Sequence, residues 1–193
     1  NCITLSTMHG CPPDEIEKIA RYLMEEKSLH TAVKLNPTLL GAKRLRSVLN
    51  DTLGFDTVVP DEAFAHDLRY EDGLDMLKNL GKTAGRAGVD FGLKLTNTLE
   101  VQNTRTIFPP NEESMYMSGR ALHPISILLA EKLQSDFSGT LDISFSAGGD
   151  CFNFTEVMAC GLRPMTVSSD ILKPGGYGRL RQYLEILDAD MEG

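Results

Sequence analysis

The chain has 193 residues, of which 41% are hydrophobic and 24% charged, and its formal net charge is −8. The length is sufficient for one domain with a substantial core, and the composition is ordinary for a globular protein. The negative charge argues against nucleic acid or an anionic membrane as the main partner, because both require a basic surface. No apolar run reaches the ~20 residues of a membrane span, so we expect no membrane partner and a cytoplasmic location.

The cysteines and histidines show no metal-binding pattern. The four cysteines contain no C-x-x-C pair, and the four histidines contain no H-x-x-x-H or H-E-x-x-H arrangement. We therefore expect reduced thiols and no metal site in this chain. Because the chain begins with Asn1 and runs at once into an apolar stretch, we interpret it as an excerpt of a longer polypeptide.

Apolar runs and helical repeats alternate along the chain. The predicted elements, in order, are strand 2–6, helix 14–26, strand 31–36, helix 42–53, strand 56–60, helix 71–87, strand 90–97, helix 123–134, strand 141–146, helix 153–160, strand 164–169 and helix 178–188. Residues 99–117, which include two adjacent prolines, are expected to form a long irregular loop, and loops of this length are often lids.

The alternation predicts an α/β fold with a parallel sheet, since parallel neighbours require crossover connections. About six βα units fit either an open doubly wound sheet or part of a (β/α)8 barrel. Polar residues follow five of the predicted strands, and a barrel rim gathers five strand ends more easily than an open sheet does. An eight-unit barrel usually needs ~250 residues, so we predict one partial TIM-barrel-type domain over residues 1–193.

Two late strand ends carry features of a phosphate site. Gly148 and Gly149 follow strand 141–146, and Ser168 and Ser169 end strand 164–169, ahead of a second Gly-Gly pair. Glycine lets backbone N–H groups approach an anion closely, and barrels often bind phosphate after their last two strands. The alternative is that both segments are ordinary turns.

Lys34 and Lys94 lie inside apolar strands, in the similar strings VKLNPT and LKLTNT. A lysine is costly to bury unless it is paired or faces a polar cleft, so one of the two is expected to face a bound anion. Asn36 and Asn97 lie nearby as amide donors. The alternatives are a lysine whose ammonium group reaches solvent, or a Schiff-base lysine of an aldolase-type barrel.

Two further segments are candidates for the same rim. In YMSGRALHP, Ser118 suits a helix N-cap or a phosphate contact, and Gly119 permits a tight turn. Cys11, in STMHGCPP, directly precedes helix 14–26. It is either a small residue in a turn or a reactive thiol at a helix mouth.

The ordered strings VKLNPT, LKLTNT, MSGRALHPIS and SAGGD resemble the flavin-binding barrel of the dihydroorotate and dihydropyrimidine dehydrogenases. The strings STMHGCPP, VKLNPTLLG, MYMSGRALHP and ILKPGGY resemble, more closely, a segment of the large iron–sulfur flavoproteins described as selenate reductase subunits or glutamate-synthase-like NADPH oxidoreductases. Together these strings span nearly the whole chain.

The resemblance implies a barrel that binds FMN at its carboxyl-terminal rim and reduces or oxidises a C=C bond of a heterocyclic substrate. It implies these roles: flavin contact for Lys34 or Lys94, phosphate contact for Gly148, Gly149, Ser168 and Ser169, substrate contact for Asn36, Thr96, Asn97, Ser118 and Gly119, and proton transfer for Cys11. FAD, NADPH and 4Fe–4S clusters are implied only elsewhere in the full-length chain, whose redox domains are then the partners of this one.

Two differences from the family pattern matter. Thr4 stands where the family has an asparagine at the first strand end, and residues 55–88 are expected to add an extra strand–helix unit. These differences keep open a second hypothesis, in which the domain is a degenerate barrel that binds no flavin and serves as a scaffold or docking domain of the larger oxidoreductase.

Overall fold

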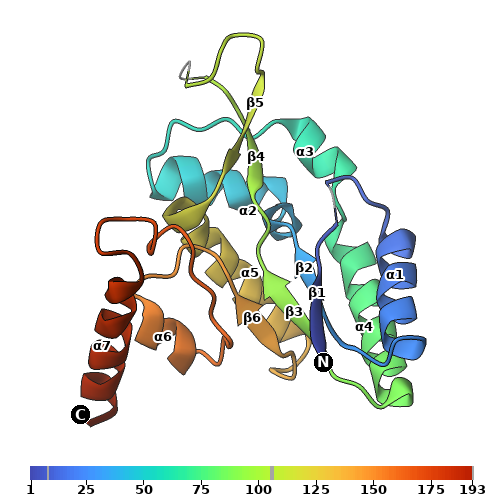
Figure 1. The fold of residues 1–193 in the computed structure, drawn as a ribbon. Coiled ribbons are helices and arrows are strands. Elements are labelled where there is room, and N and C mark those ends of the chain that lie inside the picture. The colour runs from blue at the N-terminus through green and yellow to red at the C-terminus, as the bar shows by residue number, and fades with distance from the viewer. Residues whose placement is uncertain (8, 105–106, 193) are drawn as a thin grey trace.

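A computed structural model describes residues 1–7, 9–104 and 107–192, and its centre is a parallel sheet (Figure 1). The four strands have the order β1-β2-β3-β6 and the bounds β1 (Cys2–Leu5), β2 (His30–Leu35), β3 (Phe91–Leu95) and β6 (Ile143–Phe145). Met165 extends the sheet by a single parallel bridge to Phe145. The parallel order confirms the α/β prediction, because each neighbour is reached through a helical crossover.

Helices lie between and beyond the strands. Their bounds are α1 (Pro13–Glu25), α2 (Ala42–Arg46), α3 (Asp61–His66), α4 (Tyr70–Ala87), α5 (His123–Asp136), α6 (Phe154–Ala159) and α7 (Leu180–Glu192). A π-helical segment (Ser47–Thr52) continues α2, and 3₁₀ turns occupy Pro37–Leu40, Gly119–Leu122 and Gly176–Arg179. None of these helices is both long and apolar enough to cross a bilayer.

The two faces of the sheet differ in chemistry. Successive residues of a strand point to opposite faces of the sheet. The face that packs on the helices carries apolar side chains that are at most 3% exposed: Val33, Leu35, Leu93, Leu95 and Phe145. Figure 1 shows α5 behind the sheet and α4 beside β1, next to α1, and none of the described helices lies in front of the sheet. The front face carries Thr4, Ala32, Lys34, Lys94 and Ser144, in register across the strands. The sheet is thus covered on its apolar face and open on its polar face, as in part of a barrel wall.

In the predicted extra unit 55–88, the helix is present as α4, but the predicted strand 56–60 is wrong. Its carbonyl groups are bonded elsewhere: Asn50 Nδ2 donates to Phe55 O and Thr57 O, and Arg46 donates to Val59 O. The segment is therefore an extended connection between helices. Residues between β2 and β3 form one long crossover made of α2, α3 and α4.

The stretch 99–117 is also not an irregular loop throughout. It contains an antiparallel hairpin, β4 (Leu99–Gln102) paired with β5 (Ser114–Met117), with Leu99 opposite Met117 and Val101 opposite Met115. Residues 105 and 106 of this stretch lie outside the described residues. The apolar side chains alternate with polar ones, so one side of the hairpin packs on the core.

The predicted strand 164–169 is reduced to the single bridge at Met165. The bridge consists of two backbone hydrogen bonds, from Phe145 N to Pro164 O (3.0 Å) and from Thr166 N to Phe145 O (2.8 Å). Pro164 itself lacks an N–H and can donate no ladder bond. Of the about six expected strands, four form regular sheet strands in the described residues.

Candidate functional site

Two predicted site residues, Asn36 and Asn97, meet Ser6 at the carboxyl-terminal edge of β1, β2 and β3. Asn97 Nδ2 donates to Asn36 Oδ1 (2.7 Å), and Ser6 Oγ donates to Asn97 Oδ1 (3.0 Å). The backbone holds the group in place, because Asn97 N donates to Leu35 O at 2.8 Å. The two asparagines predicted from separate strings therefore act as one amide pair at the rim.

Lys34 and Lys94 lie directly beside each other on β2 and β3, two and three residues before these asparagines. Both side chains are on the open face of the sheet. Burial lowers the pKa of Lys34, and burial together with the positive charge of Lys34 lowers the pKa of Lys94. Lys94 Nζ contacts Ser144 Oγ on β6 at 3.5 Å, and neither lysine forms an ion pair with a carboxylate of the described residues. Two adjacent cations without acidic partners favour an anionic ligand.

Thr96 does not join this group. Its side chain is 3% exposed and its hydroxyl shares a 2.9 Å hydrogen bond with Ser126 on α5, on the covered side of the sheet. The structure therefore places Thr96 in the packing between β3 and α5, and not beside the asparagines.

A second group of predicted residues lies where β5 and β6 end. Gly148 has a φ of +66°, and a Cβ there would be 2.6 Å from the carbonyl oxygen of Gly119. Gly119 in turn lies beside Ser169, whose Oγ would be 3.3 Å from an added Cβ. The segments that carry Ser118, Gly148 and Ser169 are thus brought together, whereas they are far apart in the sequence.

The glycine pair also has a packing reason that the sequence did not reveal. A Cβ on Gly149 would lie 1.8 Å from Met165 Cε, so a side chain at this position would require Met165 to move. Gly149 O accepts a hydrogen bond from Tyr183 on α7 (3.4 Å). Close approach to the protein's own chain therefore explains these glycines in part, beside the predicted contact with a phosphate.

Two buried carboxylates border this second group, and the sequence analysis did not identify them as site residues. Asp150 is 3% exposed, follows the glycine pair and forms an ion pair with Arg120. Asp170, also 3% exposed, follows the serine pair and accepts from Lys173 (3.0 Å) and Arg179 (3.0 Å). The sequence does show an acidic residue directly after each small-residue turn, which could have indicated these two carboxylates. It does not show which basic residues pair with them.

Asp170 holds the loop after Ser169 in place. Tyr183 Oη donates to it at 2.8 Å, in addition to the two cations. Burial by itself raises the pKa of Asp170, but the hydrogen bonds from Arg179, Lys173 and Tyr183 outweigh it and lower the pKa to about 2. The serine pair is thus followed by an anchored charged network, while Ser168 and Ser169 themselves are exposed.

Cys11 lies in the loop between β1 and α1, half-buried against the hydrophobic core. The same loop is fixed by Asp67: His9 Nδ1–H donates to its carboxylate (3.1 Å) and Thr38 Oγ1 donates at 2.6 Å. His9 also stacks on Tyr116 of the hairpin, with ring centroids 5.8 Å apart. The hairpin therefore reaches the loop that carries Cys11; a lid function for residues 99–117 stays a prediction.

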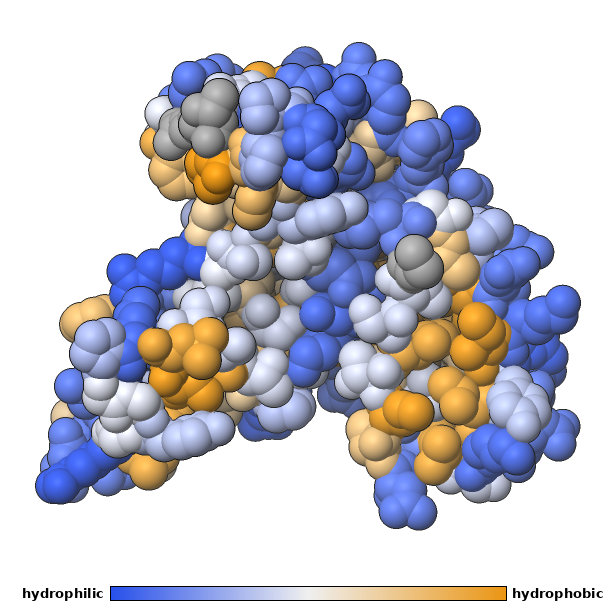
Figure 2. Space-filling model, turned by 45° about the horizontal axis from the view of Figure 1, so that its top comes forward, coloured by the Kyte–Doolittle hydropathy of each residue, from blue (hydrophilic) through white to orange (hydrophobic). Residues whose placement is uncertain are grey.

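A pocket of about 400 Å³ opens on the polar face of the sheet, with Thr4, Lys94 and Ser144 among its lining residues. In Figure 2, the view with the carboxyl ends of the strands turned forward, a hollow of mainly hydrophilic and intermediate residues separates two more apolar lobes. Lys94 thus lines the pocket on the uncovered side of the sheet, and Asp90 and Asp142 line it at the amino ends of their strands.

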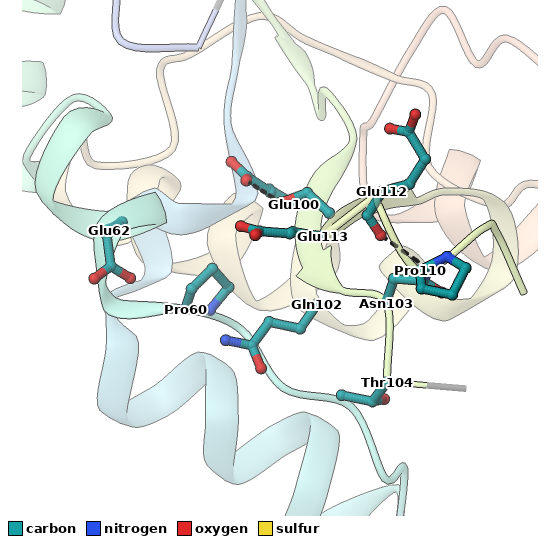
Figure 3. Close-up of a pocket in the computed structure, with 10 residues that line it drawn as sticks. Pro60, Glu62, Glu100, Gln102, Asn103, Thr104, Pro110, Glu112 and Glu113 are labelled. Carbon is teal, nitrogen blue, oxygen red and sulfur yellow. Dashed lines mark hydrogen bonds between the residues drawn. The ribbon is translucent and has the colours of Figure 1, made fainter. Parts of the chain in front are cut away.

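A larger pocket, about 600 Å³, lies at the hairpin and is lined by none of the predicted site residues. Figure 3 shows that Glu62, Glu100, Glu112 and Glu113 surround it. Four carboxylates repel a phosphate, so this pocket does not suit a flavin nucleotide. Among the described residues, no group of three or more His, Cys, Asp or Glu side chains is arranged to hold a metal ion.

Comparisons with known proteins match this chain to a family model and to similar proteins. A family model described as "Oxidoreductase YgfK, N-terminal TIM-barrel domain" matches residues 1–193. "Putative oxidoreductase YgfK" from Escherichia coli K12 is 49% identical over 187 residues, and the protein of the same name from E. coli O157:H7 is equally similar. The match covers 96% of this chain and 18% of each relative, so the chain spans less than a fifth of their length.

Proposed function

This chain belongs to the family of YgfK N-terminal TIM-barrel oxidoreductase domains, and we propose that it binds FMN at the carboxyl-terminal edge of its parallel sheet. The domain is then one module of a longer, NADPH-linked iron–sulfur flavoprotein. FAD, NADPH and the 4Fe–4S clusters belong to other domains of that polypeptide, which are the redox partners of this one.

The observation that carries the proposal is the lysine pair. Lys34 and Lys94 face the open side of the sheet with lowered pKa values and without carboxylate partners in the described residues. An anionic or electron-rich ring edge beside them relieves the repulsion between the two ammonium groups. When bound, the flavin supplies the hydride and single-electron chemistry, and the lysines orient it and stabilise negative charge on it.

The substrate binds at the polar rim formed by Asn36 and Asn97. Asn36 and Asn97, joined by their 2.7 Å hydrogen bond, each keep amide capacity for the ring atoms of a heterocycle. Cys11, in the loop above β1, transfers the proton that accompanies reduction or oxidation of the C=C bond. Asp67 supports this step indirectly, because it fixes the loop through His9 and Thr38.

The phosphate end belongs to the second group. Ser118 and Ser169 offer hydroxyl donors, Gly119 offers a backbone with φ of +69°, and Ser168 lies one residue away on the exposed loop. Arg120 supplies a cation beside them. This donor set suits a phosphate monoester, and its serine and arginine chemistry does not depend on the glycine pair alone.

A second candidate function also rests on the lysine pair. A lysine with a lowered pKa next to another cation is the setting in which amines form Schiff bases with carbonyl substrates. An aldolase-type barrel would use Lys34 or Lys94 in this way. Borohydride trapping with a carbonyl substrate, followed by peptide mapping, distinguishes it from the flavin module.

The intact protein tests the proposal through its visible absorption. We expect the purified full-length protein to release FMN on denaturation, separately from any FAD bound by the other domains. Chromatography of the released flavins measures the molar ratio of each to polypeptide. A full-length protein that holds FAD but neither carries FMN nor takes it up from solution would support the scaffold hypothesis instead.

A further inference from the structure

Asp150 is a buried carboxylate in the middle of the segment proposed to hold the phosphate. Its side chain is 4% exposed, and it directly follows Gly149. One oxygen accepts from Phe152 N (2.9 Å), and the other pairs with the guanidinium of Arg120. The loop is further closed by Asn153, whose Oδ1 accepts from Asp150 N at 2.9 Å and whose Nδ2 donates to Gly148 O at 3.2 Å. The carboxylate is therefore held by two contacts, and two more hold the loop that carries it.

Arg120 joins the two loops that meet at this place. Its backbone packs on Gly148, since a Cβ there would be 2.7 Å from Arg120 N. Its side chain reaches Asp150 from the loop after β5, yet 61% of that side chain is exposed. A guanidinium carries five N–H donors, so an arginine bound to one carboxylate keeps donors for a second anion.

The charges predict what the pair does. A phosphate monoester carries about −1.5 to −2 charges at pH 7, and a bare buried carboxylate close to it would repel it. Paired with Arg120, Asp150 belongs to a group of zero net charge, and the N–H donors of the guanidinium that Asp150 does not use face solvent. The ion pair is thus compatible with a phosphate where the carboxylate alone is not.

We propose that the Arg120–Asp150 ion pair makes this domain selective for a phosphorylated flavin, with Arg120 contacting the phosphate and Asp150 positioning Arg120. This inference rests on the proposed FMN site and names a specificity-determining residue for it. Riboflavin, which has the same ring and no phosphate, is the discriminating ligand.

The test measures affinities of FMN and riboflavin for the full-length protein freed of its FMN, by quenching of flavin fluorescence. We expect the unaltered protein to prefer FMN. Arg120→Gln should weaken FMN binding by about a hundredfold, because a charge-assisted contact is lost and Asp150 is left unpaired. Riboflavin binding should change by less than about threefold, since it lacks the group that the pair contacts.

Two further variants keep the test independent of folding. In Arg120→Gln with Asp150→Asn, no carboxylate remains unpaired, so FMN affinity should recover partly but stay about tenfold below the unaltered protein. Arg181→Gln, an exposed arginine on α7 that pairs with Glu185, is the matched control and should leave both affinities unchanged.

The outcomes separate the two proposals. If the unaltered protein binds FMN but the double variant binds FMN and riboflavin as the unaltered protein does, the ion pair has no part in selecting the phosphate. Equal losses of FMN and riboflavin in the double variant would overturn it as well. A full-length protein that binds no FMN at all overturns the proposed function itself.

Discussion

Replacing both lysines of the open sheet face, in Lys34→Met with Lys94→Met, is expected to weaken FMN binding to the full-length protein by about a hundredfold, or about tenfold for each lysine. The two ammonium groups lie side by side on β2 and β3, so both lie close to the same ligand. Methionine is about as long and unbranched as lysine, and it removes the ammonium group with its charge and its N–H donors. The measurement is a fluorescence titration with FMN, and Lys82→Met, an exposed lysine on α4, is the control.

The two lysine substitutions should not lower the stability of the domain. Burial lowers the pKa of both lysines, which means that the folded protein holds their charged forms less favourably than the unfolded chain does. Removing these charges is therefore neutral or stabilising for the domain. An FMN affinity that is unchanged in the double variant, with normal protection from hydrogen exchange, would contradict a lysine contact with the flavin.

Replacing Asp170 with asparagine is expected to reduce the local stability of residues 170–183 by about 2–4 kcal/mol. The carboxylate accepts from Lys173, Arg179 and Tyr183, and asparagine leaves those two cations without their buried anion. Hydrogen exchange of the full-length protein, read at peptides from this segment, measures the opening free energy at pH 7. Asp188→Asn, at an exposed position of α7, is the control and should leave the exchange unaltered.

The same carboxylate predicts an acid dependence. Its pKa is about 2 in the folded protein and near its ordinary value of 3.8 in the unfolded chain, so its contribution to stability is complete above pH 3.8. The contribution is lost as the pH falls from there to about 2, because the unfolded chain takes up the proton first. Protection of residues 170–183 should fall over this interval in the unaltered protein, and the part due to Asp170 should be absent from Asp170→Asn. Identical exchange of the two proteins at pH 7 would contradict the anchoring role.

The sequence predicts the elements that rest on local patterns. The helices around Ile16, Leu77 and Leu129 follow from apolar spacing, and their observed bounds differ little from the expected ones. Strand alternation places Lys34 and Lys94 on one face, and register then puts them side by side. A lysine among apolar strand residues was enough to identify each of the two as a candidate site residue.

Other parts depended on partners distant in sequence. The strand predicted at 56–60 failed because Arg46 binds Val59 O and Asn50 binds Thr57 O, a competition that no periodicity reveals. The hairpin of β4 and β5 does show alternation in LEVQ and SMYM, but the prolines between them suggested an irregular loop.

The candidate site likewise contains residues whose meeting the sequence predicts and residues that only the fold brings together. Asn36 and Asn97 meet because parallel strands end at one edge, which topology predicts. Thr96, one residue earlier and beyond the end of β3, bonds instead to Ser126 on α5, a partner that strand alternation does not predict. Arg120 and Asp150 are thirty positions apart on different loops, so only the fold could pair them.

The most direct test of the central claim locates FMN on the open face of this sheet. Competitive acetylation of the full-length protein with acetic anhydride, followed by peptide mass spectrometry, gives the reactivity of each lysine with and without FMN. The account predicts that FMN protects Lys34 and Lys94 and leaves Lys82 unchanged, because a bound anion both covers the pair and favours its charged form. Equal reactivity of Lys34 and Lys94 in the presence and absence of saturating FMN would contradict it.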